Sequence, residues 1–330
     1  MGKKNTLTFY AAGCLCLLAA LLSLSLGAAR LSPSQLFRAI LNGPTGTAGY
    51  IFWYVRLPRT AACVLAGVGL AVSGAVIQGV LQNKLASPSI IGVNAGAGLA
   101  VTVCCALGLL SGWAIALSAF SGAMISVLLV VFTAKKTGAS RTTVILGGVA
   151  VNAFLNALSE GITSLKPEVG MLSGDFRIGG FSSVSTDRLL PAGVLIVFAL
   201  VVLLTLCNDL DVLALGEDTA RGLGMSVGRT RSVFLLLAAM LAGASVSFAG
   251  LLGFVGLMVP HAARKFVGSE SRRLLPLCAI LGAGFVTACD LAARLLFTPY
   301  ELSVGILMSV LGGPFFVLLL MKQKGGQGHG

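Results

Sequence analysis

Long apolar runs alternate with short polar segments along almost the whole chain. A helix needs about 20 apolar residues to cross the hydrocarbon core of a bilayer, so each run predicts a membrane-spanning helix. The eighth run is the shortest and contains Pro260, which interrupts helical hydrogen bonding. The ten expected spans lie near residues 7–29, 57–80, 90–109, 112–134, 142–163, 189–207, 231–250, 251–265, 274–296 and 302–321.

Two polar segments interrupt this pattern. Segment 209–228 contains ALGEDTARGLG at 214–224, in which Glu217, Asp218 and Arg221 have the spacing of a short water-facing helix. Loop 164–188 is polar and glycine-containing, and it is long enough to cap a vestibule. We therefore expect residues 1–330 to form a single all-α, polytopic membrane domain with about ten transmembrane helices.

Composition supports a bilayer as the solvent. Of the 330 residues, 56% are hydrophobic and 10% are charged, whereas about a quarter of the residues of a soluble domain are charged. The net charge of +12 is scattered between the apolar runs, so we expect it to direct topology rather than to bind nucleic acid. A cytoplasmic N-terminus puts most lysines and arginines on the cytoplasmic side. Both termini and the segment 209–228 are then cytoplasmic.

Small residues recur at every fourth position in several spans. One row is Gly67, Ala71, Ala75 and Gly79, and another is Gly92, Gly96 and Ala100. Rows of this kind let transmembrane helices approach closely. We interpret them as packing faces, and we interpret GVNAGAG at 92–98 in the same way rather than as a phosphate loop.

Several kinds of chemistry lack the residues they need. The eight cysteines form no CxxC pair, and there are only two histidines, so metal and redox sites are not expected. No GxxxxGK[ST] pattern occurs, so any ATP hydrolysis must belong to another subunit. We expect no catalytic residue, no metal ligand and no cofactor bound by this chain.

Polar side chains inside the spans are the remaining candidates. Asn152, Asn156 and Glu160 lie on one face of the fifth span, where they either line a wet pathway or form hydrogen bonds between helices. Asp290 and Arg294 are four residues apart and are expected to form an ion pair within one helix.

The segment RLPR places two arginines, Arg56 and Arg59, just before the second span on the outer side. Such side chains either extend to lipid phosphates or bind an acidic protein partner. The sequence leaves both interpretations open.

Four motifs in order resemble the FecCD-type permease family, the membrane subunits of ATP-binding-cassette (ABC) importers for iron–siderophores, haem and cobalamin. They are RLPR, LAVSGAVIQGVLQNKLASPSIIGVNAGAG at 70–98, LGEDTARGLG at 215–224, and GFVGLMVPHAARKFVG at 253–268 with LLP at 274–276. The resemblance covers nearly the whole chain. One departure is Lys84, where the family usually has proline after the asparagine.

The resemblance implies a type II importer permease in the bacterial cytoplasmic (inner) membrane. Its expected partners are a second permease subunit, identical or paralogous, two cytoplasmic ABC ATPases that use ATP and Mg²⁺, and an extracytoplasmic binding (lipo)protein. The cargo is expected to be an iron chelate, with a ferric siderophore first and haem or cobalamin as alternatives. An ATP-independent secondary transporter is a further alternative.

The resemblance also implies roles for individual residues. Residues matching the ATPase-coupling region are Gly216, Glu217, Ala220, Arg221, Leu223 and Gly224. Residues matching positions that grip acidic side chains of the binding protein are Arg56, Arg59 and Arg294. The inner constriction and pathway correspond to Asn83, Leu85, Thr142 and Thr143, to which the polar face of the fifth span adds Asn152, Asn156 and Glu160.

Overall fold

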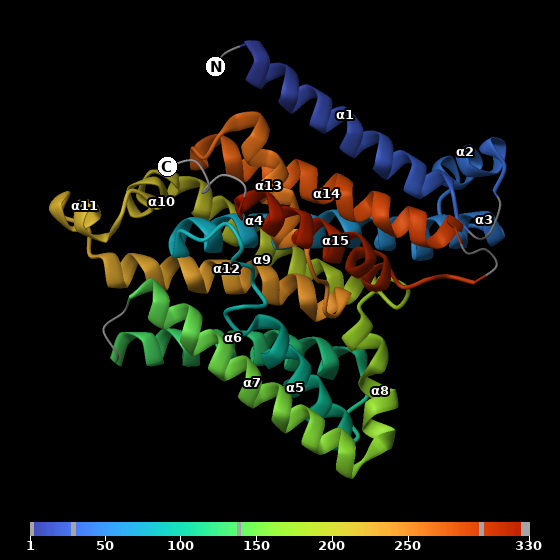
Figure 1. Cartoon of the computed structure of the whole chain (residues 1–330). Coiled ribbons are helices and arrows are strands. Elements are labelled where there is room, and N and C mark those ends of the chain that lie inside the picture. The colour runs from blue at the N-terminus through green and yellow to red at the C-terminus, as the bar shows by residue number, and fades with distance from the viewer. Residues whose placement is uncertain (1–2, 28–30, 137–139, 297–299, 325–330) are drawn as a thin grey trace.

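The computed structural model describes residues 3–27, 31–136, 140–296 and 300–324, and all regular structure in these ranges is helical (Figure 1). The expected all-α class is confirmed. The elements are α1 (Lys3–Ser25), α2 (Pro33–Leu41), α3 (Gly46–Tyr50), the π-helix η1 (Ile51–Arg56), α4 (Leu57–Leu81), α5 (Val93–Ala106), α6 (Gly112–Lys136), α7 (Arg141–Leu165), α8 (Pro167–Ile178), α9 (Thr186–Thr205), α10 (Cys207–Ala214), α11 (Glu217–Gly222), α12 (Val227–Ala249), α13 (Val255–Val267), α14 (Ser271–Leu296) and α15 (Val304–Lys324).

Each of the ten expected spans coincides with a helix, and the chain is a multi-pass membrane protein. Within the described residues, seven helical runs are long and apolar enough to cross a bilayer. These are α1, the continuous run Gly46–Leu81, α6, α7, α9, α12 and α14. The remaining three of the ten expected spans correspond to the shorter helices α5, α13 and α15.

Two of the short helices begin later than the apolar pattern predicts. α5 has 14 residues and α13 has 13, so each extends about 20 Å, whereas the hydrocarbon core is about 30 Å thick. The non-helical segments 82–92 and 250–254 lead into them. Other parts of the bundle bury Ala86, Pro88, Ile91 and Gly92 in the first segment and Gly250 and Leu252 in the second, so the irregular backbone is partly enclosed by protein.

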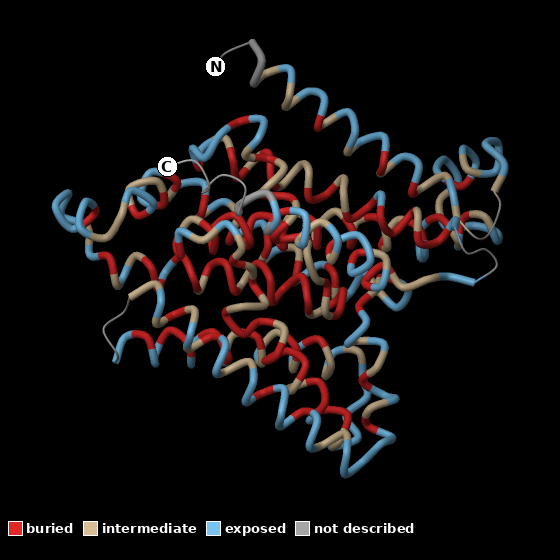
Figure 2. The backbone as a smooth tube through the Cα atoms, viewed as in Figure 1, coloured by how far each residue is buried: buried red, intermediate tan, exposed pale blue. Residues whose placement is uncertain are grey.

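The core is built around α4, which packs against α14, α12 and α13. Buried backbone is concentrated there in Figure 2. A Cβ atom on Gly67 would overlap the carbonyl of Gly282 in α14, and Gly79 faces Leu210 of α10. The row of small residues on α4 is therefore a packing face, as predicted.

The row on α5 has the same role. A Cβ atom on Gly96 would overlap the backbone of Gly122 in α6, and one on Gly122 would overlap Gly96 in return. The two helices consequently cross at backbone contact. The phosphate-loop interpretation of residues 92–98 is not needed.

Among the seven membrane-length runs, α1 and α7 leave the largest share of their apolar window uncovered. Only 11% of the apolar window of α1 and 22% of that of α7 is buried. α1 lies along the outside of the bundle against α14, whereas α7 packs against α5, α6 and α8 (Figure 1). The uncovered faces are suited to lipid or to another subunit.

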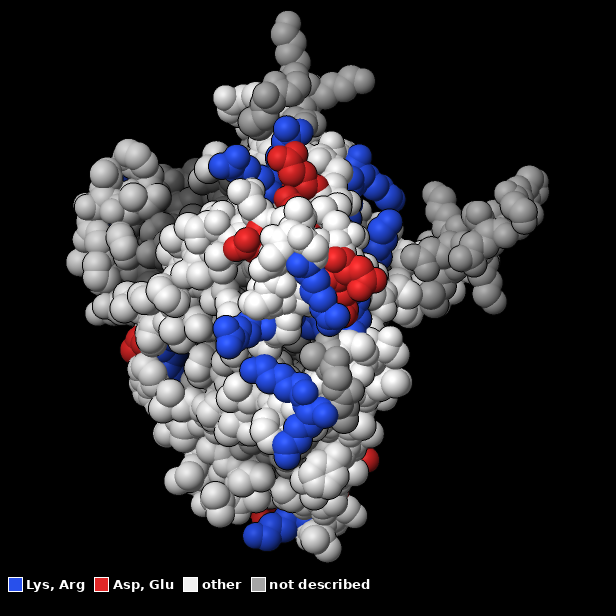
Figure 3. Space-filling model, turned by 90° about the vertical axis from the view of Figure 1, so that its left-hand side faces the viewer, with Lys and Arg blue, Asp and Glu red and all other residues white. Residues whose placement is uncertain are grey.

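The long helices run between two ends of the molecule, which we call the α11 end and the α8 end (Figure 1). Lys and Arg side chains gather at the α11 end together with several acidic ones (Figure 3). α2 and α3 lie at the α8 end with α8 itself. The polar segments 209–228 and 164–188 therefore occupy opposite ends.

Replacing Gly67 by valine should destabilise the protein, because the new side chain must separate α4 from α14. Overpacking costs about 1–3 kcal/mol, which thermal unfolding in detergent would register as a lower melting temperature. Gly13→Val is the matched control, because no heavy atom lies within 4 Å of a Cβ built there. Equal melting temperatures for the two variants would contradict the proposed contact.

Candidate functional site

At the α11 end, two glycines define the short helix α11. Gly216 precedes it with φ of +125°, and Gly224 follows it with φ of +83°, both in the region that favours glycine. The amide of Met225 donates to the Ala220 carbonyl, and that of Gly224 donates to the Arg221 carbonyl. This pair of bonds is a Schellman motif, and it ends the helix sharply after one and a half turns.

Glu217 attaches α11 to the membrane helices. Its carboxylate lies 2.5 Å from Nη2 of Arg231 in α12, and 3.7 Å from the guanidinium groups of Arg141 in α7 and Arg221 in α11 itself. Arg231 is buried, with 3% of its side chain exposed. The coupling candidate Glu217 is thus an internal anchor between α11, α7 and α12.

The other coupling candidates divide into a packed and an exposed group. Ala220 is completely buried beneath the helix. The side chain of Arg221 is 65% exposed, and residue Leu223 is exposed to the same extent. Gly224 beside them is also exposed. A partner approaching this end would meet the exposed group first.

Two further residues of α10 and α4, Asp211 and Gln82, tie α10 to the bundle through hydrogen bonds. The carboxylate of Asp211 accepts from the backbone amide of Ser271, at 2.9 Å, and caps the first turn of α14. Nε2 of Gln82, at the end of α4, donates to the carbonyls of Leu213 and Ala214 at 3.1 and 2.7 Å. α10 and α11 together therefore contact four membrane helices.

Sequence reasoning did not identify Gln82, Arg141, Asp211, Arg231 or Ser271 as members of this site. The available signal was their position, because each lies within two residues of the end of an apolar run or in the polar segment beside it. The partners themselves are up to 132 residues apart. Such pairs are visible only after folding.

The loop after α4 contains two of the predicted constriction residues, Asn83 and Leu85, both half-buried. Oδ1 of Asn83 accepts the amide of Leu85 at 2.9 Å, which closes an Asx turn. No hydrogen bond among the described residues uses the amide of Lys84. Asn83 holds the turn without the amide of Lys84, so the turn does not depend on which residue stands at position 84.

The start of α7 carries the other two, Thr142 and Thr143. Oγ of Ser140 accepts the amide of Thr143 at 3.1 Å and caps the helix. Arg141 donates to the side chain of Gln82. This contact brings the loop at residues 82–85 close to the start of α7.

The polar face of α7 divides along its length. Nδ2 of Asn152 donates to the carbonyls of Ser89 and Ile90 at 2.8 and 3.1 Å, so this residue holds the entrance loop of α5. Asn156 and Glu160 are exposed on the same helix. Hydrogen bonding between elements accounts for Asn152, while the other two remain available to a pathway.

At the α8 end, Arg56 and Arg59 lie within a continuous helical run that begins at Gly46, not in a loop before the span. Arg56 is 3% exposed. Its Nη1 donates to the carbonyls of Leu24 and Ser25 at 2.8 and 2.6 Å, and so caps the last turn of α1. This burial rules out an extended contact of Arg56 with lipid phosphates.

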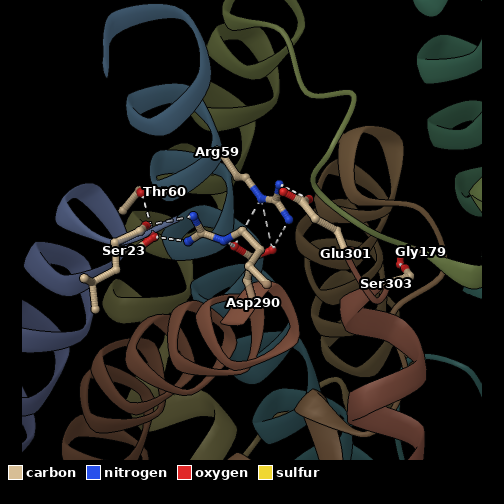
Figure 4. Close-up of polar contacts among 9 residues, drawn as sticks. Ser23, Arg59, Thr60, Gly179, Asp290, Glu301 and Ser303 are labelled. Atoms are coloured by element: carbon tan, nitrogen blue, oxygen red, sulfur yellow. Dashed lines mark hydrogen bonds and ion pairs between the residues drawn. The ribbon is translucent and has the colours of Figure 1, made fainter. Parts of the chain in front are cut away.

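Asp290 is the shared counter-ion of Arg59 and Arg294 (Figure 4). Its carboxylate, 1% exposed, lies 3.0 Å from Nη2 of Arg59 and 3.0 Å from Nε of Arg294. The predicted pair between Asp290 and Arg294 is therefore confirmed and extended to α4. Nη2 of Arg294 also donates to Oγ of Ser23 in α1 at 2.8 Å.

A cavity of about 430 Å³ opens beneath α8. Polar side chains on its wall include Arg59, Asp175, Arg188 and Glu301. Oε2 of Glu301 lies 2.8 Å from Nη1 of Arg59. The segment expected to be a polar loop is largely helical, and it forms one wall of this cavity.

In the ranges that the structure describes, no three His, Cys, Asp or Glu side chains are placed to hold a metal ion. The eight cysteines are free thiols, and six of them are buried. They pack as small apolar residues.

Comparisons with known proteins agree with this arrangement. The chain is 37% identical to an iron(3+)-hydroxamate import system permease protein of Bacillus subtilis, over 95% of this chain and 82% of that protein. It is 34% identical to a hemin transport system permease protein of Yersinia pestis, over 93% of this chain and 95% of that protein.

A solved structure with the same fold is described as a metal-chelate type ABC transporter in an inward-facing conformation. It superposes with a TM-score of 0.84 at 27% identity, and the match covers 95% of this chain and 98% of the other. The sequence profile of the FecCD transport family matches residues 15–322. The chain therefore belongs to the FecCD transport family.

Proposed function

We propose that the protein is the permease subunit of an ABC importer and forms the pathway for an iron chelate that a binding protein delivers. The observation that carries this proposal is the junction at the α11 end. A short exposed helix is joined through Glu217 to Arg231 in α12 and Arg141 in α7. A force applied to α11 therefore reaches membrane helices through ion pairs rather than through a flexible loop.

The Lys and Arg side chains at the α11 end support the orientation, and membership of the family supports the partners. The α11 end faces the cytoplasm, where two ABC ATPase subunits contact the exposed face of α11, and both termini lie on the same side. ATP and Mg²⁺ are bound by the ATPases, and this chain binds no cofactor. The α8 end faces outward, in the cytoplasmic membrane of a bacterium.

A second permease subunit, identical or paralogous, completes the pathway. The uncovered face of α7 supports this arrangement, because it carries exposed Leu146 and Val149 next to the polar side chains of Asn156 and Glu160. Apolar positions would pack against the partner, and the polar ones would face water. Asn83, Leu85, Thr142 and Thr143 lie at the cytoplasmic end of this route.

A ferric siderophore is the cargo that we favour. The iron-hydroxamate permease of Bacillus subtilis is the relative that supports it, while the hemin permease of Yersinia pestis supports haem as the alternative. Cobalamin is a third possibility from the family resemblance. The permease requires no tight site of its own, because the binding protein selects the cargo.

The three arginines at the α8 end differ in how far they stabilise the fold and how far they can contact a partner. Arg56 and Arg294 cap α1 and are almost fully buried. Arg59 exposes 11% of its side chain and lines the outer cavity. We therefore assign direct contact with an acidic side chain of the binding protein to Arg59, with Arg56 and Arg294 supporting it.

Reconstitution of the permease with its ATPase and binding protein in liposomes tests the cargo. We expect ATP-dependent uptake of an iron-55-labelled ferric hydroxamate siderophore, and no uptake when ATP is omitted. Preferential uptake of haem or cobalamin would reassign the cargo. Uptake by the permease alone would instead indicate a secondary transporter.

Two substitutions separate ATPase docking from force transmission. Leu223→Asp places a charge on the exposed face of α11, and we expect it to weaken ATPase binding about tenfold, equivalent to about 1.4 kcal/mol. Glu217→Gln should leave the ATPase bound but lower transport per ATP hydrolysed, because α11 loses its ion pairs. ATPase co-purification and coupled uptake measure these effects.

Leu165→Asp is the control for the first variant, since Leu165 is 87% exposed at the far end of α7. It should leave ATPase binding unchanged. Normal ATPase binding by Leu223→Asp would contradict the docking role of the exposed face of α11. Normal coupling by Glu217→Gln would contradict the role of Glu217 in force transmission.

Asp290→Asn should destabilise the permease itself, because the buried Arg294 loses its carboxylate partner and Arg59 loses the buried one of its two. Breaking a buried ion pair from one side costs about 3–5 kcal/mol. Glu270→Gln is the matched control, since Glu270 and Arg273 form an exposed pair at 3.2 Å, and such pairs contribute about 0–1 kcal/mol. Similar melting temperatures in detergent for the two variants would contradict the assigned role of Asp290.

A further inference from the structure

Arg59 holds two carboxylates in very different surroundings. Its Nε and Nη2 atoms face Asp290 at 3.0–3.2 Å, and only 1% of that aspartate side chain is exposed. Its Nη1 atom faces Glu301 at 2.8 Å, and 37% of the glutamate side chain is exposed (Figure 4). One edge of the guanidinium is thus buried in the bundle, and the other is in contact with water.

The two carboxylates also differ in how they are held. Asp290 lies inside α14 and is shared with Arg294, so it cannot leave without separating α14 from α4 and α1. Glu301 lies in the non-helical segment before α15, between the exposed Tyr300 and the half-buried Leu302. Rotation of its side chain moves no helix.

Energy favours exchange at the exposed edge only. A partly exposed ion pair is weak because water and salt compete with it, whereas removal of one partner from a buried pair costs several times more. An incoming carboxylate can therefore replace Glu301, and it cannot replace Asp290.

The outer cavity gives such a carboxylate access. Arg59 and Glu301 both line it, and its rim includes the exposed residues Asp175 and Ser182. The described arginine cluster holds three guanidinium groups, Arg56, Arg59 and Arg294, against two carboxylates, Asp290 and Glu301. An acidic side chain that enters the cavity from outside reaches Arg59, the member of this cluster that lines it.

We propose that Glu301 is an exchangeable counter-ion, which shields Arg59 in the undocked permease and is displaced when an acidic side chain of the binding protein docks. This inference rests on the proposed docking role of Arg59. The guanidinium keeps two carboxylates before, during and after docking. Release of the binding protein is then assisted by the return of Glu301.

Binding measurements on the complete importer in nanodiscs test this exchange. The probe is the binding protein isolated with the transporter, and its Kd is compared for wild type, Glu301→Gln, Arg59→Gln and the double variant. We expect Glu301→Gln to lower Kd about fivefold, equivalent to about 1 kcal/mol, because the competing carboxylate is gone. Arg59→Gln should raise Kd, and in that background Glu301→Gln should have no further effect.

Glu168→Gln is the control for net charge. Glu168 is an exposed acidic residue in the first turn of α8, and its substitution removes the same charge as Glu301→Gln. It should leave Kd within about twofold of wild type, well under 1 kcal/mol. Arg59→Lys replaces Arg59→Gln if the latter does not fold, because lysine keeps the charge beside Asp290 but cannot span two carboxylates.

The outcomes distinguish the two proposals. An unchanged Kd for folded Arg59 variants would overturn the docking role, and this inference with it. A raised Kd for the Arg59 variants together with an unchanged Kd for Glu301→Gln would leave docking intact and overturn the exchange. Weaker docking with a lower melting temperature for Glu301→Gln would identify Glu301 as a structural strut, and would also overturn it.

Discussion

The constraint on which this structure depends is that polar groups in an apolar solvent must find their partners within the chain. The last carbonyls of α1 are satisfied by Arg56 and Arg294 rather than by water. Those guanidinium groups in turn require counter-charge, which Asp290 supplies to Arg294. Each polar group is thus satisfied by the next one along. These contacts hold α1 and α4 against α14 at one end of the bundle.

The same constraint organises the opposite end with a different outcome. Glu217, Asp211 and Gln82 connect α10 and α11 to α4, α7, α12 and α14. Here the groups are partly exposed, with 24% of the Glu217 side chain reaching solvent. Ion pairs that retain some hydration can be rearranged at moderate cost, which suits a junction that must move. The buried pairs at the α8 end suit a fixed support.

Between the two ends, packing depends on small residues rather than on polar contacts. Gly67 meets Gly282, and Gly96 meets Gly122, at distances that allow no Cβ atom. An apolar helix face is solvated as well by lipid as by another helix. Close backbone contact therefore supplies the extra van der Waals attraction that favours helix–helix packing over helix–lipid contact. The short helices α5 and α13 each follow an irregular segment that this packed core partly encloses.

The sequence by itself determined the class, the ten helical segments, the packing rows and the pair between Asp290 and Arg294, because these follow from local periodicity and from contacts three or four residues apart. Its motifs also indicated the family and the segment around Glu217. Only the tertiary structure decided which charged groups are buried. Arg56 and Arg59 both precede an apolar run in the sequence. Arg56 is nevertheless buried against the end of α1, whereas Arg59 keeps one edge on the outer cavity and binds Asp290, 231 residues away. Periodicity contains no information about such distant partners, because burial depends on which helices pack together.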